Sequence, residues 1–400
     1  MEMTTGHFRK RLPLRFSIYL GLAAALLIAG CDLLSPGESG SSAIRYESPD
    51  CPAGALRCGD WRWSPDGEEI VYLWWLPYEG SRPRHEFRAV DVSSRKVRTL
   101  VEAFDDRRIV LAWIGMQVFG SYLYYSATDE TGISDNGCCS GPGRGSDIYR
   151  VRIDGGTPER VAQNIGTRYA VSPDGYTLVS KRLTADEHLS RYDIRTRTWS
   201  DFPVPLLAGW VNWAPDGSSL AVVDNFAGQS GSAGGQLYDF STKSVRRWQE
   251  PEGVIGNGGS EVSRTIVWDR GEAYLVAVRS PGTVVRRRLR DDTDAVVHTF
   301  GPGLHANRLD GLSVSADARF AAMWRTRCPT DGSGCEQGVL ELVVVDLQSG
   351  GEVVVDIPED VTRLLARGFR APFPPVLAPD GCRVAIVSAG LWIRPVPGAC

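Results

Sequence analysis

The chain has 400 residues, of which 42% are hydrophobic and 23% are charged, and these ordinary globular values exclude wholesale disorder. Its formal net charge of −4 argues against a nucleic-acid-binding protein that depends on a basic surface. Glycine (44 residues) and proline (24 residues) are numerous enough to predict many turns. The length exceeds that of an average domain, but all-β propellers of this length occur as single units.

The first thirty residues have the pattern of a targeting segment rather than of a folded region. Four basic residues between positions 9 and 15 precede an apolar run at 16–29, which is short for a bilayer span. The residues that follow, Ile28-Ala29-Gly30-Cys31, resemble the lipobox of bacterial lipoproteins. The resemblance implies cleavage before Cys31 and lipidation of Cys31, and two or three acyl chains anchor a protein stably. An ordinary secretory signal or a short anchor helix is the alternative.

These features predict a lipoprotein signal peptide at 1–30, a flexible Ser/Gly/Pro-rich tether at 31–42 and a folded body at 43–400. Removal of residues 1–30 takes away four basic and one acidic side chain, which changes the net charge from −4 to −7. We therefore expect an exported protein of the bacterial cell envelope, on the periplasmic or cell-surface side, held at a membrane by its lipid. The sequence is compatible with an anchor in the inner membrane and with one in the outer membrane.

Eight further cysteines form an even set, as expected in an oxidising compartment. All eight are disulfide candidates: Cys51, Cys58, Cys138, Cys139, Cys328, Cys335, Cys382 and Cys400. The first two are separated by six residues, as are Cys328 and Cys335, so each pair can close a small local loop. Cys382 and Cys400 flank a predicted hairpin, whereas the adjacent pair at 138–139 either bonds to itself or elsewhere. The connectivity stays open, and the spacing does not favour a metal site.

The body repeats a tight turn followed by an apolar strand. Five copies start with an apolar residue: WSPDG from Trp63, VSPDG from Val171, WAPDG from Trp213, VSADA from Val314 and LAPDG from Leu377. Two weaker copies without the proline start at Val118 and Trp268. Proline presets φ, aspartate accepts backbone hydrogen bonds and glycine supplies a positive φ, so each copy predicts a hairpin. The structural turn residues are Asp66, Gly67, Asp174, Gly175, Asp216, Gly217, Asp317, Asp380 and Gly381.

A second hairpin signal follows in most repeats, and two hairpins in a period of about fifty residues make a four-stranded propeller blade. The seven first hairpins predict an all-β propeller of seven blades, with six or eight as alternatives because weak copies are easily miscounted. Only six second hairpins are visible, so the last blade lacks a strand. We expect a strand at 42–46 to complete it, which closes the ring with the N- and C-terminal strands together.

These turns resemble the WD40-like, PD-type repeats of TolB and of the propellers of prolyl oligopeptidase-type enzymes. The copies at 64–73, 172–179 and 214–223 are the most similar, and the matches span about 61–390. TolB also has an N-terminal α/β domain, for which residues 43–60 leave no room, so the resemblance concerns the propeller only. It implies a scaffold of envelope complexes, although many activities use this fold.

No motif predicts a catalytic residue, a metal ion or a cofactor. The chain has no G-x-S-x-G elbow, and no separate hydrolase domain is expected. The histidines His85, His188, His298 and His305 lack metal-ligand spacing, although residues from several blades can meet at a central channel, where His305 is the first to check. The acidic run at 291–294 resembles a calcium cluster, but arginines precede it, so pairing with them or exposure to water is favoured.

Two long insertions, at 127–146 and 327–338, are the predicted interaction loops. Trp63, Trp213 and Trp268 occupy equivalent positions and are expected to pack between blades, whereas Trp75 is a weak candidate for carbohydrate stacking. The first hypothesis is a monomeric, non-catalytic lipoprotein whose propeller binds an unknown envelope protein or polymer, and not nucleic acid. The alternative is a propeller lyase or hydrolase that acts on glycans at the channel mouth. A passive ring without a fixed ligand is a third possibility.

Overall fold

The structure is a computed structural model, and by residue contacts the chain divides into a unit of residues 1–42 and a unit of residues 43–400. The described residues all lie in the second unit: 46–47, 61–79, 82–102, 107–108, 116–129, 146–182, 188–206, 209–224, 234–251, 264–279, 282–302, 304–306, 312–328, 338–357, 375–387 and 390–400. They form strands and turns, so the predicted all-β propeller is confirmed. Among them no helix is long and apolar enough to cross a membrane.

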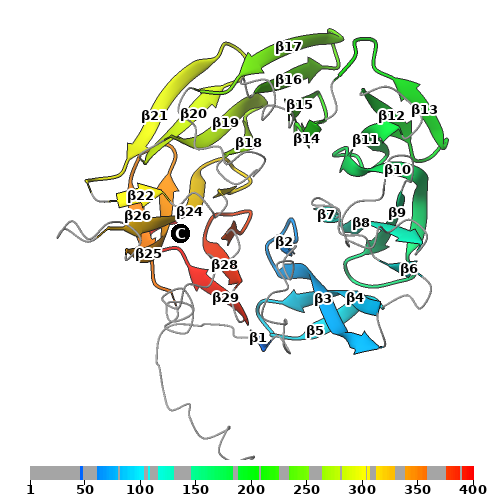
Figure 1. Cartoon of the computed structure of the whole chain (residues 1–400), viewed down its shortest axis with the longest axis horizontal. Helices are drawn as coiled ribbons and strands as arrows, with labels where there is room; N and C mark the ends of the chain where they lie inside the picture. Colours follow the sequence, from blue (N-terminus) through cyan, green and yellow to red (C-terminus); the bar gives the residue numbers. More distant parts are fainter. Residues whose placement is uncertain are drawn as a thin grey trace, which may run out of the picture. The chain divides into compact units, whose positions relative to one another are not determined.

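The strands of the first half of the chain form three antiparallel sheets, which Figure 1 colours from blue to green. The first contains β2 (Trp61–Trp63), β3 (Glu69–Glu79), β4 (Arg82–Asp91) and β5 (Val97–Val101). The second contains β6 (Arg107–Arg108), β7 (Met116–Phe119), β8 (Tyr122–Asp129), β9 (Ser146–Arg152), β10 (Glu159–Val171), β11 (Thr177–Arg182), β12 (Leu189–Asp193) and β13 (Thr198–Asp201). The third contains β14 (Gly209–Trp213), β15 (Ser219–Asp224), β16 (Gly234–Asp239) and β17 (Ser244–Gln249).

Three further sheets follow in chain order. The fourth contains β18 (Arg264–Asp269), β19 (Glu272–Arg279), β20 (Thr283–Arg288) and β21 (Thr293–Thr299). The fifth contains β22 (Leu304–Ala306), β23 (Ser313–Val314), β24 (Phe320–Arg327), β25 (Val339–Asp346) and β26 (Glu352–Val355). The last contains β27 (Val376–Leu377), β28 (Arg383–Val387), β29 (Gly390–Pro395) and the N-terminal β1 (Tyr46–Glu47).

The described strands form six hydrogen-bonded sheets rather than seven, and six is one of the expected alternatives. Two sequence repeats share the eight-stranded sheet through β10, a continuous strand of 13 residues. The first part of β10 pairs with β9 and the last part with β11, and Ile165 pairs with a residue on each side. The number of repeated turns therefore predicts the number of first hairpins correctly, but it does not determine where one sheet ends and the next begins.

The predicted closure by the two terminal strands is confirmed. Tyr46 pairs with Leu391 and Glu47 with Gly390, so β1 supplies the outermost strand of the last sheet beside β29 (Figure 1). The observed strand covers the end of the expected segment, since residues 42–45 lie outside the described part. A disulfide bond between Cys382 and Cys400 joins the start of β28 to the chain beyond β29, with 5.7 Å between the Cα atoms.

The repeated turn has the hydrogen bonds that its residue types predict. In the first copy, Asp66 Oδ1 accepts from Ser64 Oγ at 2.5 Å and from the backbone N–H of Glu68 at 3.0 Å. The N–H of Gly67 donates to the carbonyl of Ser64 at 2.9 Å, with φ of +74° at the glycine. Gly175, Gly217 and Gly381 have φ of +73° or +74°, and Ala318 takes the same place at +57°. The turn therefore fixes the first two strands of the five repeats that carry it with local bonds alone.

The second strand of each repeat is buried on both faces, as its continuous hydrophobicity predicts. In β3 the four successive residues Ile70–Leu73 are all buried. Their side chains alternate between two hydrophobic clusters, one shared with β27–β29 and the other with β7–β9. Each fully buried aliphatic or aromatic side chain contributes about 2 kcal/mol, so packing between sheets is the main source of stability.

Polar side chains also connect the first strands of neighbouring sheets. The Trp63 indole donates to the carbonyl of Val376 at 2.9 Å, and the Trp268 indole donates to Asn212 Oδ1 at 2.7 Å. Both tryptophans are buried between sheets, which confirms that they are core residues rather than ligand-stacking platforms. Trp213 is half-buried and stacks on Phe240, and it packs against the hydrophobic cluster shared by its own sheet and the eight-stranded sheet, as predicted.

We expect Gly381→Ala to destabilise the protein more than Gly217→Ala. Both residues have φ of +73°, but a Cβ at Gly381 would lie 2.4 Å from the Phe320 ring of the preceding sheet, whereas the nearest atom at Gly217 is 3.9 Å away. Left-handed strain costs about 1 kcal/mol and overpacking about 2 kcal/mol more. Urea unfolding should therefore show losses of about 3 and about 1 kcal/mol, and equal losses would contradict the close contact between these sheets.

We expect acid to weaken the second hairpin of the first repeat. Hydrogen bonds from the Ser94 N–H and the Ser93 hydroxyl lower the pKa of Asp91 from 3.8 to about 2. Because the pKa is lowered on folding, the stabilisation is complete above pH 4 and is lost as the pH falls toward 2. Urea midpoints across this range should fall less steeply in Asp91→Asn, which cannot ionise at this position. If the urea midpoint of Asp91→Asn falls with pH as steeply as that of the unmodified chain, the Asp91 carboxylate does not contribute to the acid sensitivity.

Candidate functional site

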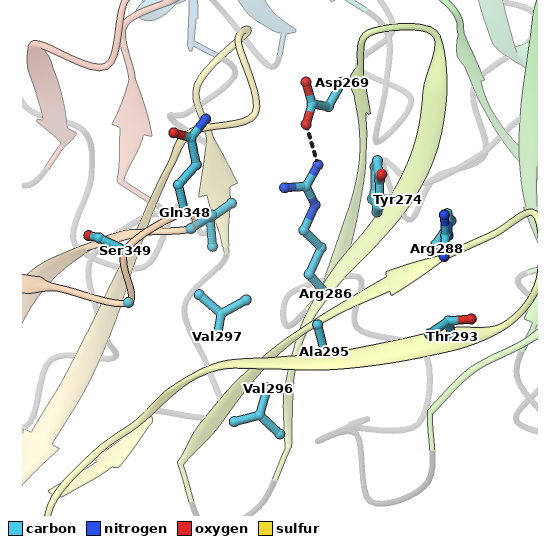
Figure 2. A pocket seen from close by; sticks show the side chains of 12 residues that line it. Asp269, Tyr274, Arg286, Arg288, Thr293, Ala295, Val296, Val297, Gln348 and Ser349 are labelled. Carbon is cyan, nitrogen blue, oxygen red and sulfur yellow. Dashed lines mark hydrogen bonds and ion pairs between the residues drawn. The ribbon is translucent and has the colours of Figure 1, made fainter.

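Two grooves lie between neighbouring sheets. Groove A has a volume of about 510 Å³ and lies between the β18–β21 sheet and the turn at 347–350 after β25 (Figure 2). Groove B has a volume of about 480 Å³ and lies between the eight-stranded sheet and the β14–β17 sheet, where two of the repeated turns, at 172–174 and 216–217, form part of its lining. Both volumes lie in the range of small-ligand sites.

Arg286 occupies the middle of groove A. Figure 2 shows its side chain reaching from β20 toward Asp269, whose Oδ2 lies 2.7 Å from Nη2. The guanidinium carbon lies 3.7 Å from the centre of the Tyr274 ring. The charge of Arg286, which is 14% exposed, is therefore balanced by a carboxylate and an aromatic face within the same sheet.

The acidic run at 291–294 is also neutralised by arginines. Asp294 accepts from Arg287 Nε at 2.5 Å and also from Arg279. The hydrogen bond from Arg287 is the main cause that lowers the pKa of Asp294. Arg288 pairs with Asp291 at 3.0 Å. This arrangement confirms the expected pairing of these charges and leaves no calcium cluster among these residues.

The outer wall of groove A is β21, the last strand of its sheet. Figure 2 shows Ala295 and Val297 on the side of β21 that faces Arg286 and Gln348, with Val296 on the other side. Val296 is 63% exposed, the highest value among the large hydrophobic residues that the structure describes. An apolar side chain on an exposed strand edge is a typical feature of a surface that pairs with another chain.

The opposite wall of groove A approaches β21 through Gly350. Its φ is +72°, and a Cβ there would lie 2.5 Å from the carbonyl oxygen of Val297. His298 Nδ1 donates to the carbonyl of Gly350 at 2.9 Å, and His298 Nε2 lies 3.0 Å from Glu352. His298, one of the four candidate histidines, therefore connects two sheets.

A buried arginine supports this wall from behind. The Arg325 side chain is 2% exposed, and it donates to Glu341 at 2.8 Å and to Glu352 at 2.7 Å. Glu341 also accepts from Arg327, which lies near the surface. The network connects β24, β25, β26 and, through His298, β21. Sequence reasoning did not identify Arg325, because nothing in its local pattern distinguishes a buried arginine from an exposed one.

Groove B contains the aspartates of three turns. Asp174, Asp193 and Asp216 each accept hydrogen bonds with Oδ1 from their own turn. Arg191 on β12 lines the same groove, with its guanidinium carbon 5.4 Å from the centre of the Phe202 ring and 5.9 Å from that of the Phe240 ring. Groove B therefore combines a cation, aromatic rings and carboxylates.

Several predicted site residues fall outside the described part of the chain: Cys31, Cys51, Cys58, Cys138, Cys139 and Cys335. The same is true of most of the two insertions, at 130–145 and 329–337. Cys328 forms a disulfide bond. His85 and His305 lie on β4 and β22, but their side chains are not described. The described residues contain no group of three or more His, Cys, Asp or Glu that could hold a metal ion.

Neither sequence comparison identifies a family. No family model matches the chain, and no curated protein of similar sequence was found.

Comparison of structures finds propellers of low sequence identity. An oligogalacturonate lyase in complex with manganese matches with a TM-score of 0.53 and 13% identity, over 90% of this chain and 97% of that one. The oligogalacturonate lyase of Vibrio parahaemolyticus matches with 0.52 and 12%, over 90% and 98%. A chain of the mitotic checkpoint complex matches with 0.50 and 16%, over 91% and 97%. At such identities the likeness shows the fold alone.

TolB from Acinetobacter baumannii is also among the matching structures, with a TM-score of 0.40 and 12% identity over 86% of each chain. This score is too low to carry an argument about function. The comparisons therefore support the propeller fold, whereas the scaffold role and the glycan-lyase alternative both stay predictions.

We expect Arg325→Met to destabilise the protein by about 3 kcal/mol or more, because it leaves two partly buried carboxylates without their shared partner. Arg327→Met is the matched control, since Arg327 pairs with the same Glu341 but is 57% exposed, and it should cost less than about 1 kcal/mol. Urea unfolding of both variants measures the difference. Similar losses would contradict the buried network as the support of groove A.

Proposed function

We propose that the protein is a lipid-anchored, non-catalytic scaffold of the bacterial cell envelope that binds an extended segment of another envelope protein along β21. The observation that supports this proposal most directly is the exposed strand edge beside groove A, with Val296 outward and the turn at 347–350 opposite. An extended peptide can add its backbone to such an edge while its side chains enter the neighbouring groove.

The charges of groove A also favour recognition over catalysis. Catalytic groups have ionisable side chains that stay available to the substrate. In groove A, by contrast, Arg286 and Arg288 are paired with Asp269 and Asp291. These fixed pairs give the groove a defined polar floor, which suits selection of a partner.

The membrane anchor of this proposal comes from the sequence. The lipobox-like Ile28–Cys31 places the lipid directly before the predicted tether at 31–42. A flexible chain of twelve residues spans about 20 Å on average. The propeller would then work close to the membrane surface, where its partner is an envelope protein.

The test places a photo-reactive amino acid at Val296, in cells that export the full chain. We expect a discrete crosslinked adduct of one envelope protein, which is lost when groove A carries Ala295→Asp. The same probe at Val339, an exposed position on β25, is the matched control and should give no such adduct. The Cys31→Ser chain should give less adduct, because it cannot be acylated at that position.

The proposal is wrong if Val296 and Val339 give the same adducts, or if neither gives any. The glycan-lyase alternative has its own readout in the purified protein. Oligogalacturonate is incubated with the protein, with and without Mn²⁺. If the protein is a lyase, an unsaturated product with a new ultraviolet absorbance forms, which the scaffold proposal does not predict.

A further inference from the structure

An arginine recurs at one position of the propeller repeat. Seven repeats in the described part of the chain share a backbone hydrogen bond from a residue after the third strand back to the first hairpin. In three of them the donors are Ile153, Ile194 and Leu289, which donate to Ser121, Tyr176 and Ala273. Because these bonds join backbone atoms, they define equivalent positions in the repeats independently of residue type. Three residues before each of these three donors stands an arginine: Arg150, Arg191 and Arg286.

Two of these arginines are neutralised in the same way. Arg150 pairs with Glu159 at 2.8 Å and lies over the Tyr122 ring at 4.9 Å. Arg286, in groove A, pairs with Asp269 and lies over Tyr274. Tyr122 and Tyr274 occupy equivalent places, each directly after the carbonyl that accepts the aligning bond. A ring and an acid are therefore the standard environment of this arginine.

Arg191 has no tyrosine at the equivalent place, and no acid among the described residues pairs with it. The residue equivalent to the two tyrosines is Thr177, whose smaller side chain lines groove B instead of covering the arginine. The guanidinium lies beside Phe202 and Phe240, and it forms no ion pair or hydrogen bond with the residues that the structure describes. A desolvated guanidinium without a partner is costly and selects for an anionic group with two oxygens.

The other charges of groove B restrict what kind of anion fits. Hydrogen bonds from Thr196 and Ser218 lower the pKa of Asp193 and of Asp216, so both are ionised at neutral pH. Each uses Oδ1 in its own turn. Asp216 keeps Oδ2 as an acceptor near the groove, whereas Oδ2 of Asp193 lies 3.6 Å from Arg195 Nη2. A plain anion would be repelled by these carboxylates. A ligand that carries a positive group near its carboxylate would instead satisfy both charges of the groove.

We propose that groove B is a binding site for a small amino carboxylate, whose carboxylate pairs with Arg191 and whose ammonium group faces the turn aspartates Asp174 and Asp216. The volume of about 480 Å³ accommodates such a molecule. The Phe202 and Phe240 rings hold the guanidinium in place before the ligand arrives, which reduces the entropy lost on binding. This inference does not rest on the proposed function, because groove A lies on different sheets.

The test is calorimetric titration of the purified propeller-containing chain with a series of amino carboxylates, namely glycine, 3-aminopropanoate, 4-aminobutyrate and 6-aminohexanoate. Butyrate and butylamine, each with one of the two charges, are the ligand controls. We expect at least one amino carboxylate to bind about tenfold more tightly than either control. Arg191→Met should weaken that binding by about tenfold or more. Arg191→Lys should weaken it by less, because lysine keeps the positive charge but cannot bind a carboxylate with two parallel N–H groups.

Arg150→Met is the matched protein control. Arg150 occupies the equivalent position but is already paired with Glu159, so its loss should leave the titration unchanged. The proposal is overturned if no amino carboxylate binds, if butyrate binds as tightly as 4-aminobutyrate, or if Arg191→Met binds as the unmodified chain does. Should Arg191→Met fail to fold by circular dichroism, the ligand series on the unmodified chain and on Arg191→Lys decides.

Discussion

The aspartate-centred tight turn is the local interaction on which the rest of this propeller depends. The carboxylate of Asp66, for example, accepts from a hydroxyl two residues before it and from a backbone N–H two residues after it, while the neighbouring glycine takes a positive φ. Because these bonds are local, each repeat forms its first hairpin without help from distant segments. The apolar strand that follows can then be buried between two neighbouring sheets, where most of the stability arises.

Closure adds a long-range constraint to these local ones. The last sheet takes its outer strand from the N-terminal side of the folded unit, and the Cys382–Cys400 bond holds the C-terminal hairpin of the same sheet. Trp63 donates across the junction to Val376, and Arg383 donates across it to the carbonyl of Gly67. The first and last sheets are thus connected by side-chain hydrogen bonds to the backbone and by a shared hydrophobic core.

Small departures from a common repeat create the candidate binding surfaces. Where the repeat keeps its tyrosine and an acid, as around Arg286, the charge of the arginine is balanced within its own sheet. Where Thr177 replaces the tyrosine and no acid is supplied, Arg191 is left beside an open groove. Groove A has the opposite character, since its charges are paired and its exposed feature is the apolar edge at Val296. One scaffold therefore presents two chemically different grooves.

The sequence by itself determined the features that depend on neighbouring residues: the turns at positions such as Asp66 and Gly217, the buried strands after them, the all-β propeller and the terminal strand that completes the last sheet. It also indicated pairing between arginines before 291 and acids after them on one hairpin, which holds for Arg287 and Arg288. Only the tertiary structure decided that β10 joins two repeats into one sheet, since that depends on whether a strand runs on without a break. It also decided that Arg325 is buried between two glutamates, while Arg191 forms no ion pair with the described residues. Such contacts depend on strand register within a sheet and on how the neighbouring sheets pack, and no local sequence pattern records either.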